Sequence, residues 1–255
     1  MHFARTTATA ASLVLMTALS AAPAAAVVAG TPAGAPAYPW LASIGSQLFF
    51  LRPSGQFCGG TLVAPDKVLT AAHCVAPFAK LIGALRVTFG RTDLKRANGV
   101  TVSVRKAWVH PGFHETTFQG EMVEHDDVAV LTLSRRLPRA VLPLGRMTSG
   151  KALVLGWGTV SESDLLNAVL RAARIPVDPD AACTKAYGSS FDARGMACAG
   201  SSRADTCLFD SGGPLILQGR VAGLTSWAAG CARPGFPGVY TRVSAYADDI
   251  EAQLR

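Results

Sequence analysis

The sequence has no apolar stretch long enough to cross a bilayer as a helix, which takes ~20 residues. Its one apolar segment near the start, about residues 10–22, follows Arg5 and is shorter than that. Ala24-Ala25-Ala26 then supplies the small residues that signal peptidase recognises. This arrangement predicts a secretory signal peptide over residues 1–26, and hence a secreted, extracellular protein without a membrane anchor. The alternative is a buried N-terminal helix.

Long runs of basic residues are also missing, although the 255 residues have a formal net charge of +7. No basic run is longer than Arg135-Arg136, and aromatic residues do not alternate with it. Proteins that bind nucleic acids usually cluster Lys and Arg on one face. The charge is therefore interpreted as a solvated basic surface, and no nucleic-acid partner is expected. The alternative is a surface that meets nucleic acid or acidic polymers.

Cysteine pairs with the Cys-x-x-Cys spacing of a zinc site are absent, and no acidic loop has the spacing of a calcium site. We therefore expect no metal and no cofactor. All six cysteines follow residue 26, and an even number in an exported chain predicts three disulfides. The sequence leaves the pairing open, and free buried thiols are the alternative. The six are Cys58, Cys74, Cys183, Cys198, Cys207 and Cys231.

Helical periodicity is scarce, and short apolar runs separated by Gly, Pro, Asn and Asp dominate the chain. Many short strands with frequent turns predict an all-β sandwich or barrel. Only residues 244–255 are predicted to be helical, with Ser244 as the N-cap. Tyr246, Ile250 and Leu254 recur at four-residue spacing on one face of this helix. The predicted strands are Leu41–Ile44, Lys67–Leu69, Leu85–Phe89, Val100–Val104, Val128–Leu133, Ala152–Leu155, Pro214–Leu217, Val221–Ser226 and Gly238–Val243.

A serine between small residues, in Asp210-Ser211-Gly212-Gly213-Pro214, is the first candidate for chemistry. Glycines allow a tight turn that exposes the hydroxyl and lets backbone N–H groups converge on a substrate oxygen. A serine hydroxyl is a poor nucleophile until a base takes its proton. His73 suits this role because it follows a strand-like run and Cys74 can tether it. The other histidines of the mature chain lie among polar or turn residues and suit it less: His110, His114 and His125.

A base of this kind needs a carboxylate that holds its tautomer and stabilises the imidazolium. Asp126 and Asp127 stand at the start of an apolar strand, where side chains alternate between faces and only one can point inward. Each piece alone has an ordinary explanation: a turn, a surface histidine and a pair of solvated acids. Together in one exported all-β chain they indicate nucleophilic catalysis by serine.

Several motifs identify a family. The chain resembles the trypsin–chymotrypsin family of serine proteases from Val27 to its end, with the family's motifs in the same order. The resemblance implies that Ser211 is the nucleophile, His73 the general base and Asp127, rather than Asp126, the partner of the base. The motifs are Cys58–Val63, Leu69–Cys74, Asp127–Leu131, Gly156–Gly158, Asp210–Pro214, Ser226–Trp227 and Pro237–Thr241.

The resemblance also implies the architecture: two six-stranded antiparallel β-barrels, about residues 27–138 and 146–243, with a C-terminal helix over 244–255 and the site between the barrels. The Pro-containing segment 135–145 would connect the two halves. We expect a monomer that meets protein or peptide substrates and protein inhibitors of proteases, and the excess of Arg over Lys favours a bacterial source. The implied disulfides are Cys58–Cys74, Cys183–Cys198 and Cys207–Cys231.

Specificity in trypsin-like members depends on a carboxylate six residues before the nucleophile, which is Asp205 here. It would attract a substrate Arg or Lys, because an unpaired buried charge is costly. At the mouth, Ala228 stands where the family's trypsins have glycine, and its methyl group narrows the entrance. The alternative is that Asp205 is a loop acid. The other implied pocket residues are Thr206, Ser226, Trp227 and Gly238.

Activation in this family uses a new N-terminus, usually Ile-Val-Gly-Gly, that pairs with the aspartate before the serine. Val27-Val28-Ala29-Gly30 matches approximately, and Asp210 is the implied partner of Val27. Signal cleavage after Ala26 would itself produce this N-terminus. Cleavage further upstream, near Ser20, would leave a short propeptide.

The oxyanion hole departs from the family pattern. The family has glycine two residues before the nucleophile, where this chain has Phe209. The two expected donors to the oxyanion are the N–H groups of Phe209 and Ser211, and losing one such donor costs ~10²–10³-fold in turnover. The alternative function is therefore an impaired or inactive homologue that binds protein through the same cleft. An esterase of another fold is not supported, because the Gly-x-Ser-x-Gly motif is absent around Ser211.

Overall fold

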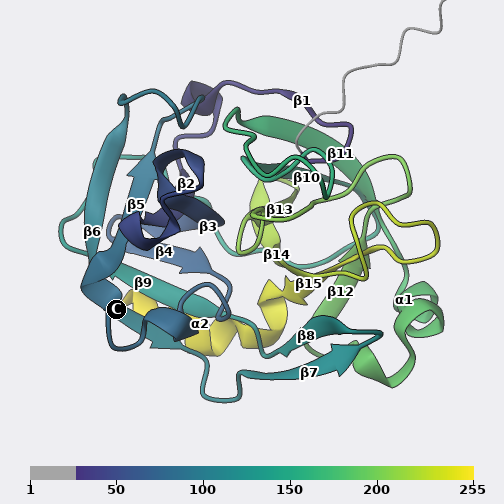
Figure 1. The fold of residues 1–255 in the computed structure, drawn as a ribbon. Coiled ribbons are helices and arrows are strands. Elements are labelled where there is room, and N and C mark those ends of the chain that lie inside the picture. The colour runs from purple at the N-terminus through teal and green to yellow at the C-terminus, as the bar shows by residue number, and fades with distance from the viewer. Residues whose placement is uncertain (1–26) are drawn as a thin grey trace, which may run out of the picture.

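The computed structural model describes residues 27–255, so the predicted signal peptide lies outside the described residues. Two β-barrels stand side by side, as Figure 1 shows, with short helices around them. The predicted architecture of two six-stranded antiparallel barrels and a C-terminal helix is confirmed. Each predicted strand is present; two match to the residue, and the ends of the others differ by at most five residues.

The first barrel closes through the strand order β2-β3-β4-β9-β6-β5, and every neighbouring pair is antiparallel. Alternate side chains point inward, and Ile44, Leu62, Val87 and Leu131 form a fully buried core there. The strands are β2 (Leu41–Ser46), β3 (Gln56–Ala64), β4 (Lys67–Thr70), β5 (Leu85–Phe89), β6 (Val100–Val109) and β9 (Ala129–Leu133).

The second barrel is a ring with the order β11-β10-β13-β14-β15-β12, which the pair Val177 and Ala199 closes between β11 and β12. Its interior contains the buried side chains of Val154, Ile175 and Leu215. The short β1 (Thr31–Pro32) adds to the edge of β11. The strands are β10 (Gly150–Gly156), β11 (Arg171–Val177), β12 (Met196–Ala199), β13 (Pro214–Leu217), β14 (Arg220–Trp227) and β15 (Gly238–Arg242).

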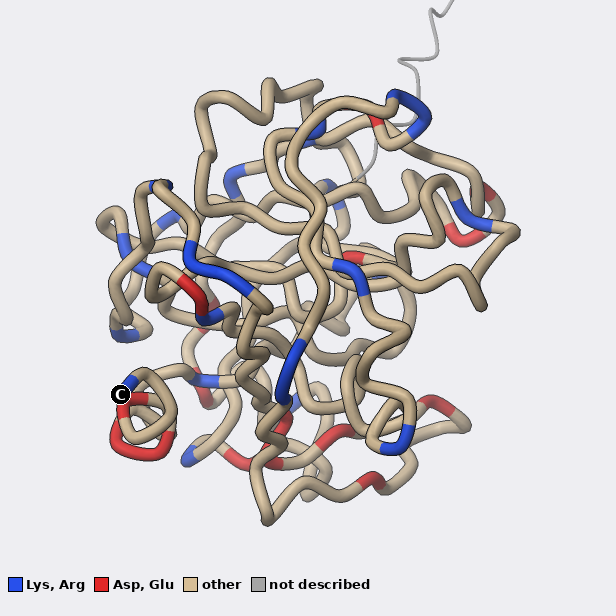
Figure 2. Tube along the Cα trace, turned by 90° about the vertical axis from the view of Figure 1, so that its left-hand side faces the viewer, with Lys and Arg blue, Asp and Glu red and all other residues tan. Residues whose placement is uncertain are grey.

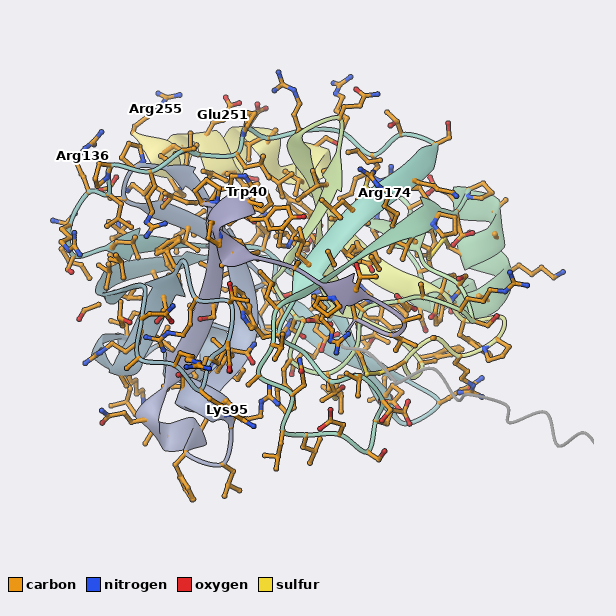
Figure 3. All side chains as sticks on the ribbon, turned by 90° about the horizontal axis from the view of Figure 1, so that it is seen from above. Trp40, Lys95, Arg136, Arg174, Glu251 and Arg255 are labelled. Atoms are coloured by element: carbon orange, nitrogen blue, oxygen red, sulfur yellow. A yellow bond between two sulfur atoms is a disulfide. The ribbon has the colours of Figure 1, made fainter. Side chains whose placement is uncertain are left out.

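A third apolar cluster joins the two barrels. Leu69 and Val130 of the first barrel pack there with Ile216 and Leu224 of the second. Trp40, which Figure 3 labels, packs against this cluster and against the core of the first barrel. Burial of this apolar surface stabilises the packing of the two barrels against each other, and so fixes their relative position.

The α-helices are α1 (Asp180–Tyr187) and α2 (Ala247–Leu254). The sequence pattern does not predict α1, because its eight residues bury only Cys183 and Tyr187 and show little periodicity. In α2 the predicted apolar face is present, but the predicted N-cap is wrong. The helix follows Tyr246, which makes no side-chain cap, and Ser244 lies in the preceding 3-10 turn. The 3-10 turns are Ala35–Ala37, Gln47–Phe49, Pro53–Gly55, Ala76–Phe78, Ile82–Ala84, Gly188–Ser190 and Val243–Tyr246.

A separate β-hairpin, β7 (His114–Phe118) and β8 (Glu121–His125), lies below the barrels in Figure 1. Val123 of this hairpin is fully buried in an apolar cluster with Trp227 of the second barrel. The hairpin lies between β6 and β9 in the sequence, but it packs against the second barrel. Its second strand ends two residues before Asp127.

The three predicted disulfides are present, in the pairs Cys58–Cys74, Cys183–Cys198 and Cys207–Cys231. Lys and Arg residues are scattered over many loops and strands rather than gathered into one run, as Figure 2 shows. Within residues 27–255, no helix is both long and apolar enough to span a bilayer.

Candidate active site

His73 lies in the turn that follows β4, and the Cys58–Cys74 disulfide ties this turn back to β3. Its ring nitrogen Nδ1 lies 2.9 Å from Oδ2 of Asp127, and its backbone N–H donates to Oδ1 of the same carboxylate at 2.9 Å. Two bonds to one carboxylate fix both the backbone and the ring. Nε2 is thereby left as the nitrogen that is not bound to Asp127.

Asp127 lies between β8 and β9 and is 1% exposed. Its Oδ2 also accepts a 2.6 Å hydrogen bond from the Ser226 hydroxyl, and its carbonyl oxygen accepts from Thr241 Oγ1 at 2.7 Å. Asp126 points elsewhere, since its carboxylate accepts from the Tyr246 hydroxyl at 2.8 Å. The structure thus turns Asp127 toward the histidine and Asp126 toward the C-terminal helix.

Charge and burial compete at this pair. Burial alone would lower the pKa of His73, but the charge of Asp127 and its hydrogen bond outweigh burial and raise the pKa to about 9. Burial likewise opposes ionisation of Asp127, yet the charge of His73 and the hydrogen bonds from His73 and Ser226 lower its pKa. The arrangement therefore stabilises an imidazolium next to a carboxylate, which is the charge state that a general base creates.

Ser211 lies in the turn before β13, where the two barrels meet backbone to backbone. Gly59 N–H donates to the Ser211 carbonyl oxygen at 2.8 Å. Gly212 has φ +72, and a Cβ there would approach the Gly59 carbonyl oxygen to 2.8 Å and collide with Thr70 Oγ1. Only glycine at position 212 lets the turn of the second barrel seat itself against β3 and β4.

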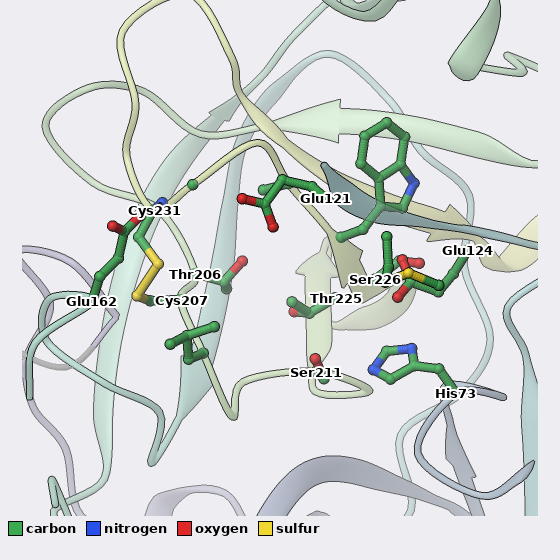
Figure 4. A pocket seen from close by; sticks show the side chains of 15 residues that line it. His73, Glu121, Glu124, Glu162, Thr206, Cys207, Ser211, Thr225, Ser226 and Cys231 are labelled. Carbon is green, nitrogen blue, oxygen red and sulfur yellow. Dashed lines mark hydrogen bonds between the residues drawn. A yellow bond between two sulfur atoms is a disulfide. The ribbon is translucent and has the colours of Figure 1, made fainter. Parts of the chain in front are cut away.

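Ser211 and His73 line one cavity of about 510 Å³. Figure 4 shows the His73 ring beside Ser211. No hydrogen bond joins the Ser211 hydroxyl to the ring within residues 27–255, and Nε2 lies 3.6 Å from Cys74 Sγ. Catalytic hydrogen bonds are often long without substrate and tighten when it binds. The other lining residues are Glu121, Met122, Glu124, Glu162, Thr206, Cys207, Leu208, Thr225, Ser226, Trp227, Ala228, Gly230 and Cys231.

The two expected oxyanion donors are free. Neither the N–H of Phe209 nor that of Ser211 finds an acceptor in the described part of the chain. Phe209 has φ +71, in the left-handed region that favours glycine. The backbone therefore adopts here the conformation that the family's glycine allows, with a side chain present.

The predicted pocket residues divide into two groups. Thr206, Ser226, Trp227 and Ala228 line the cavity, whereas Asp205 and Gly238 do not. Asp205 is fully buried next to Thr206, and its carboxylate accepts from the N–H groups of Thr206 at 2.8 Å and Gly238 at 3.0 Å. Burial raises the pKa of Asp205 to about 8, against the effect of these hydrogen bonds.

The implied activation pair requires cleavage of the chain before Val27. Val27 follows Ala26, so its nitrogen is an amide and carries no charge. Its side chain is fully buried in the core of the second barrel. Asp210 accepts instead from the N–H groups of Gly158 at 2.9 Å and Cys207 at 3.1 Å. Burial raises the pKa of Asp210 to about 7, although these bonds and the charge of Arg52 lower it.

Three glutamates that no sequence motif predicts also line the cavity. Glu121 and Glu124 of the β7–β8 hairpin line it, as does Glu162. Burial raises the pKa of Glu124 to about 7, and the charge of His73 opposes this shift. A signal existed for Glu124, which stands three residues before Asp127 on the strand that leads to it.

Comparison with known proteins agrees with the geometry. A family model described as Trypsin matches residues 27–250. A trypsin of Saccharopolyspora erythraea is 39% identical over 213 residues, which cover 80% of this chain and 90% of that protein. Trypsin-1 of Astacus astacus is 34% identical over 89% of this chain and 99% of its own length. Kallikrein-14 of Homo sapiens is 36% identical over 85% of this chain and 80% of its own length. A match of this extent, on a fold that brings a hydrogen-bonded histidine and aspartate beside a serine, shows that the chain belongs to the trypsin family of serine peptidases.

Proposed function

We propose that the protein is a secreted endopeptidase that hydrolyses peptide bonds after Arg or Lys through an acyl-enzyme. The observation that supports this best is the His73–Asp127 pair, joined by two hydrogen bonds of 2.9 Å, whose ring lines the same cavity as Ser211. A base, its carboxylate partner and a hydroxyl on a tight turn are the three groups that activation of a serine requires.

The steps follow from this arrangement. Ser211 Oγ attacks the scissile carbonyl carbon while His73 Nε2 takes the hydroxyl proton, and Asp127 stabilises the resulting imidazolium. His73 then gives the proton to the leaving amine, the C–N bond breaks, and the acyl group stays on Ser211. Water attacks the acyl carbon and gives a proton to His73, which returns it to Ser211 as the carboxylic product leaves.

The tetrahedral intermediate carries a negative oxygen that needs donors. The free N–H groups of Phe209 and Ser211 are the proposed donors. Removing one donor of such a pair typically costs ~10²–10³-fold in turnover. The left-handed backbone of Phe209 supports an intact pair, because the same region is open to the glycine that the family has at this position.

The preference for Arg or Lys rests on Asp205. Thr206, Ser226 and Ala228 line the cavity, and the backbone N–H of Thr206 donates to the carboxylate of Asp205 at 2.8 Å. A buried carboxylate whose pKa is raised to about 8 lacks a counter-charge. A guanidinium or ammonium group supplies it and turns a costly buried acid into an ion pair.

The test combines labelling with turnover. A fluorophosphonate reagent should label Ser211 covalently, and an Arg-amide substrate should be cleaved at a rate proportional to the labelled fraction. Ser211→Ala and His73→Ala should abolish both signals, while Ser43→Ala, which removes a buried hydroxyl of β2, should retain them. Labelling of Ser211 without cleavage of Arg or Lys substrates would contradict the proposed Arg/Lys specificity but not the proposed serine mechanism.

A non-catalytic protein that binds polypeptides through the cleft is the second candidate. It is favoured by one observation, the phenylalanine ring at a position where the family has glycine. If Ser211 in the folded protein stays unlabelled but a protein inhibitor of trypsin-like proteases still binds, this second function replaces the first.

We further propose that signal cleavage after Ala26 releases Val27 and that its new α-amino group pairs with Asp210. The buried Val27 side chain already occupies the second barrel, and Asp210 is a buried carboxylate without an ion-pair partner within 4 Å among residues 27–255. Mass spectrometry of the secreted protein measures the N-terminus. A fully active protein that starts before Val27 contradicts the insertion.

A further inference from the structure

Phe209 adopts a backbone conformation that its side chain disfavours. Its φ of +71 lies in the left-handed region, where a Cβ crowds the following carbonyl oxygen. Such a residue persists only when its surroundings hold it in place. The contacts of Phe209 therefore show what keeps the backbone in this state.

The carbonyl group of Phe209 is held by a side-chain amide. Gln56, the first residue of β3, is 1% exposed and donates from Nε2 to the Phe209 carbonyl oxygen at 2.8 Å. The same Nε2 donates to the Cys58 carbonyl oxygen at 3.2 Å. Both hydrogens of the amide nitrogen are thus used, and one of them fixes the orientation of the peptide that follows Phe209.

The ring of Phe209 is held by a buried cation. The guanidinium carbon of Arg52 lies 4.2 Å from the ring centroid, and Arg52 is 6% exposed. A cation over an aromatic face attracts the ring electrostatically, and more strongly where water is excluded. The ring is therefore pinned on the side of the first barrel.

Arg52 also determines which way the Gln56 amide points. Its Nη2 donates to Gln56 Oε1 at 2.7 Å and to the Trp157 carbonyl oxygen at 3.1 Å, and its Nε donates to the Gln56 carbonyl oxygen at 3.3 Å. Because Oε1 accepts from Arg52, the amide nitrogen must face the Phe209 carbonyl. A further bond from Nη1 goes to the Leu165 carbonyl oxygen.

The charge of Arg52 has no acidic partner within 4 Å among residues 27–255. A buried cation without a carboxylate is costly, and here carbonyl oxygens and an aromatic face take the place of the acid. The charge of Arg52 also lowers the pKa of Asp210, against the larger effect of burial on that carboxyl. Arg52 thus contacts the Phe209 ring and acts electrostatically on Asp210, which lies between Phe209 and Ser211 in the sequence.

We propose that Arg52 and Gln56 are positioning residues that hold Phe209 in the left-handed conformation, so that its N–H faces the cleft as an oxyanion donor. This rests on the proposed function, in which that N–H stabilises the tetrahedral intermediate. We call Arg52 and Gln56 together the clamp. Their contacts hold Phe209 at a positive φ that glycine would reach without such support. Without it, Phe209 relaxes to negative φ and its peptide N–H rotates away.

The proposal predicts that the clamp matters only while residue 209 has a side chain. Arg52→Met, which keeps most of the side-chain volume, should lower kcat for an Arg-amide substrate by roughly 10–100-fold with little change in KM, approaching the loss of one donor. In a Phe209→Gly background the same substitution should change kcat by less than about threefold, because glycine reaches φ +71 unaided. Gln56→Met should follow the same pattern.

The controls separate positioning from stability. Arg139 is the matched control, because its guanidinium carbon lies 5.6 Å from the ring centroid of Phe89 in the first barrel. Arg139→Met should leave kcat unchanged in both backgrounds. Rates are expressed per Ser211 labelled by the fluorophosphonate, so that loss of folded protein does not count. If Arg52→Met does not fold, Gln56→Met and Arg52→Lys provide the comparison, with Arg52→Lys retaining an intermediate rate because it keeps the charge but not the forked donors.

Three outcomes overturn the proposal. Equal losses of kcat in the wild-type and Phe209→Gly backgrounds show that Arg52 and Gln56 act only on stability or packing. An unchanged or increased kcat for both Arg52→Met and Gln56→Met, with Phe209 present, shows that the clamp does not hold the donor in its working direction. No labelling of Ser211 in either background overturns the proposed function itself, and the positioning role with it.

Discussion

Oδ2 of Asp127 accepts a 2.6 Å hydrogen bond from the Ser226 hydroxyl as well as the 2.9 Å bond from His73. Ser226 belongs to β14 of the second barrel, whereas Asp127 lies two residues before the start of β9 of the first. The carboxylate that orients the histidine is thus held from across the cleft. The relative position of the two barrels therefore acts directly on the pair.

Ser226→Ala should lower kcat by roughly 10–100-fold, because a hydrogen bond to a charged group contributes about 1.5–3 kcal/mol. The Asp127 carboxylate loses a donor, so its pKa rises and it stabilises the His73 imidazolium less. Steady-state kinetics on an Arg-amide substrate measures the effect, with Ser43→Ala as the matched buried serine. An unchanged kcat for Ser226→Ala would show that this bond is incidental.

The activity should depend on pH through His73. Its pKa is raised to about 9 by Asp127, against burial, and only the neutral ring accepts a proton from Ser211. The rise of kcat/KM with pH should therefore have its midpoint above the unperturbed value of about 6.5. Asp127→Asn should move the midpoint to lower pH, since burial then dominates, and should reduce kcat strongly.

The free energy of unfolding should also depend on pH through His73. The folded pKa of His73 lies above the unfolded one, so its contribution is fully present below pH ~6.5 and is lost as pH rises through about 9. Urea unfolding of wild type and His73→Gln across this window measures the difference. A difference in unfolding free energy that does not change between pH 6.5 and 9 would contradict the raised pKa.

Asp205 should destabilise the free enzyme increasingly as the pH rises from ~4 through about 8, while it confers specificity. Its folded pKa of about 8 exceeds the unperturbed value of ~3.9, so its contribution to stability is lost as pH rises from ~4 through about 8. Asp205→Asn should therefore be more stable than wild type at pH 8 by at least about 1.4 kcal/mol, one pKa unit. It should also lose cleavage after Arg and Lys.

The control for this prediction is Asp248→Asn, which removes an exposed carboxylate from α2. Thermal and urea unfolding at pH 5 and pH 8 give the comparison, and benzamidine, a small aromatic cation, probes the pocket. Wild-type stability that increases between pH 5 and 8 relative to Asp205→Asn would contradict the prediction. Unimpaired cleavage of Arg substrates by the variant would contradict the pocket assignment.

A free amine at Val27 should activate the protein. A chain that starts at Val27 should turn over faster and melt at a higher temperature than one with Ala26 attached, because an ion pair with Asp210 orders the turn around Ser211. Pairing raises the pKa of the amine above its usual ~8, so activity is retained below the raised value and lost as pH rises through it. Carbamylation of the α-amino group should abolish the gain, and Asp210→Asn should remove the difference between the two chains.

Much of the fold follows from local pattern, because strands with one buried face need alternating or continuous apolar residues and Gly or Pro turns. Residues 85–89 and 214–217 match their predicted strands to the residue. The helix α1 escapes prediction because eight residues around a disulfide need little periodicity of their own. The N-cap at Ser244 fails because a 3-10 turn, set by packing of Val243 and Tyr246, comes first.

Short motifs in the sequence identified the family, and the resemblance then implied the two barrels, the three disulfide pairings and the roles of His73, Asp127 and Ser211. The tertiary structure brings Asp127 to His73, as the resemblance implied, and it alone shows that Asp126 bonds to the Tyr246 hydroxyl. Only the structure, too, places Arg52 and Gln56 against Phe209, 157 and 153 residues further along the chain. Contacts between residues so far apart depend on how the barrels pack, which no local pattern encodes.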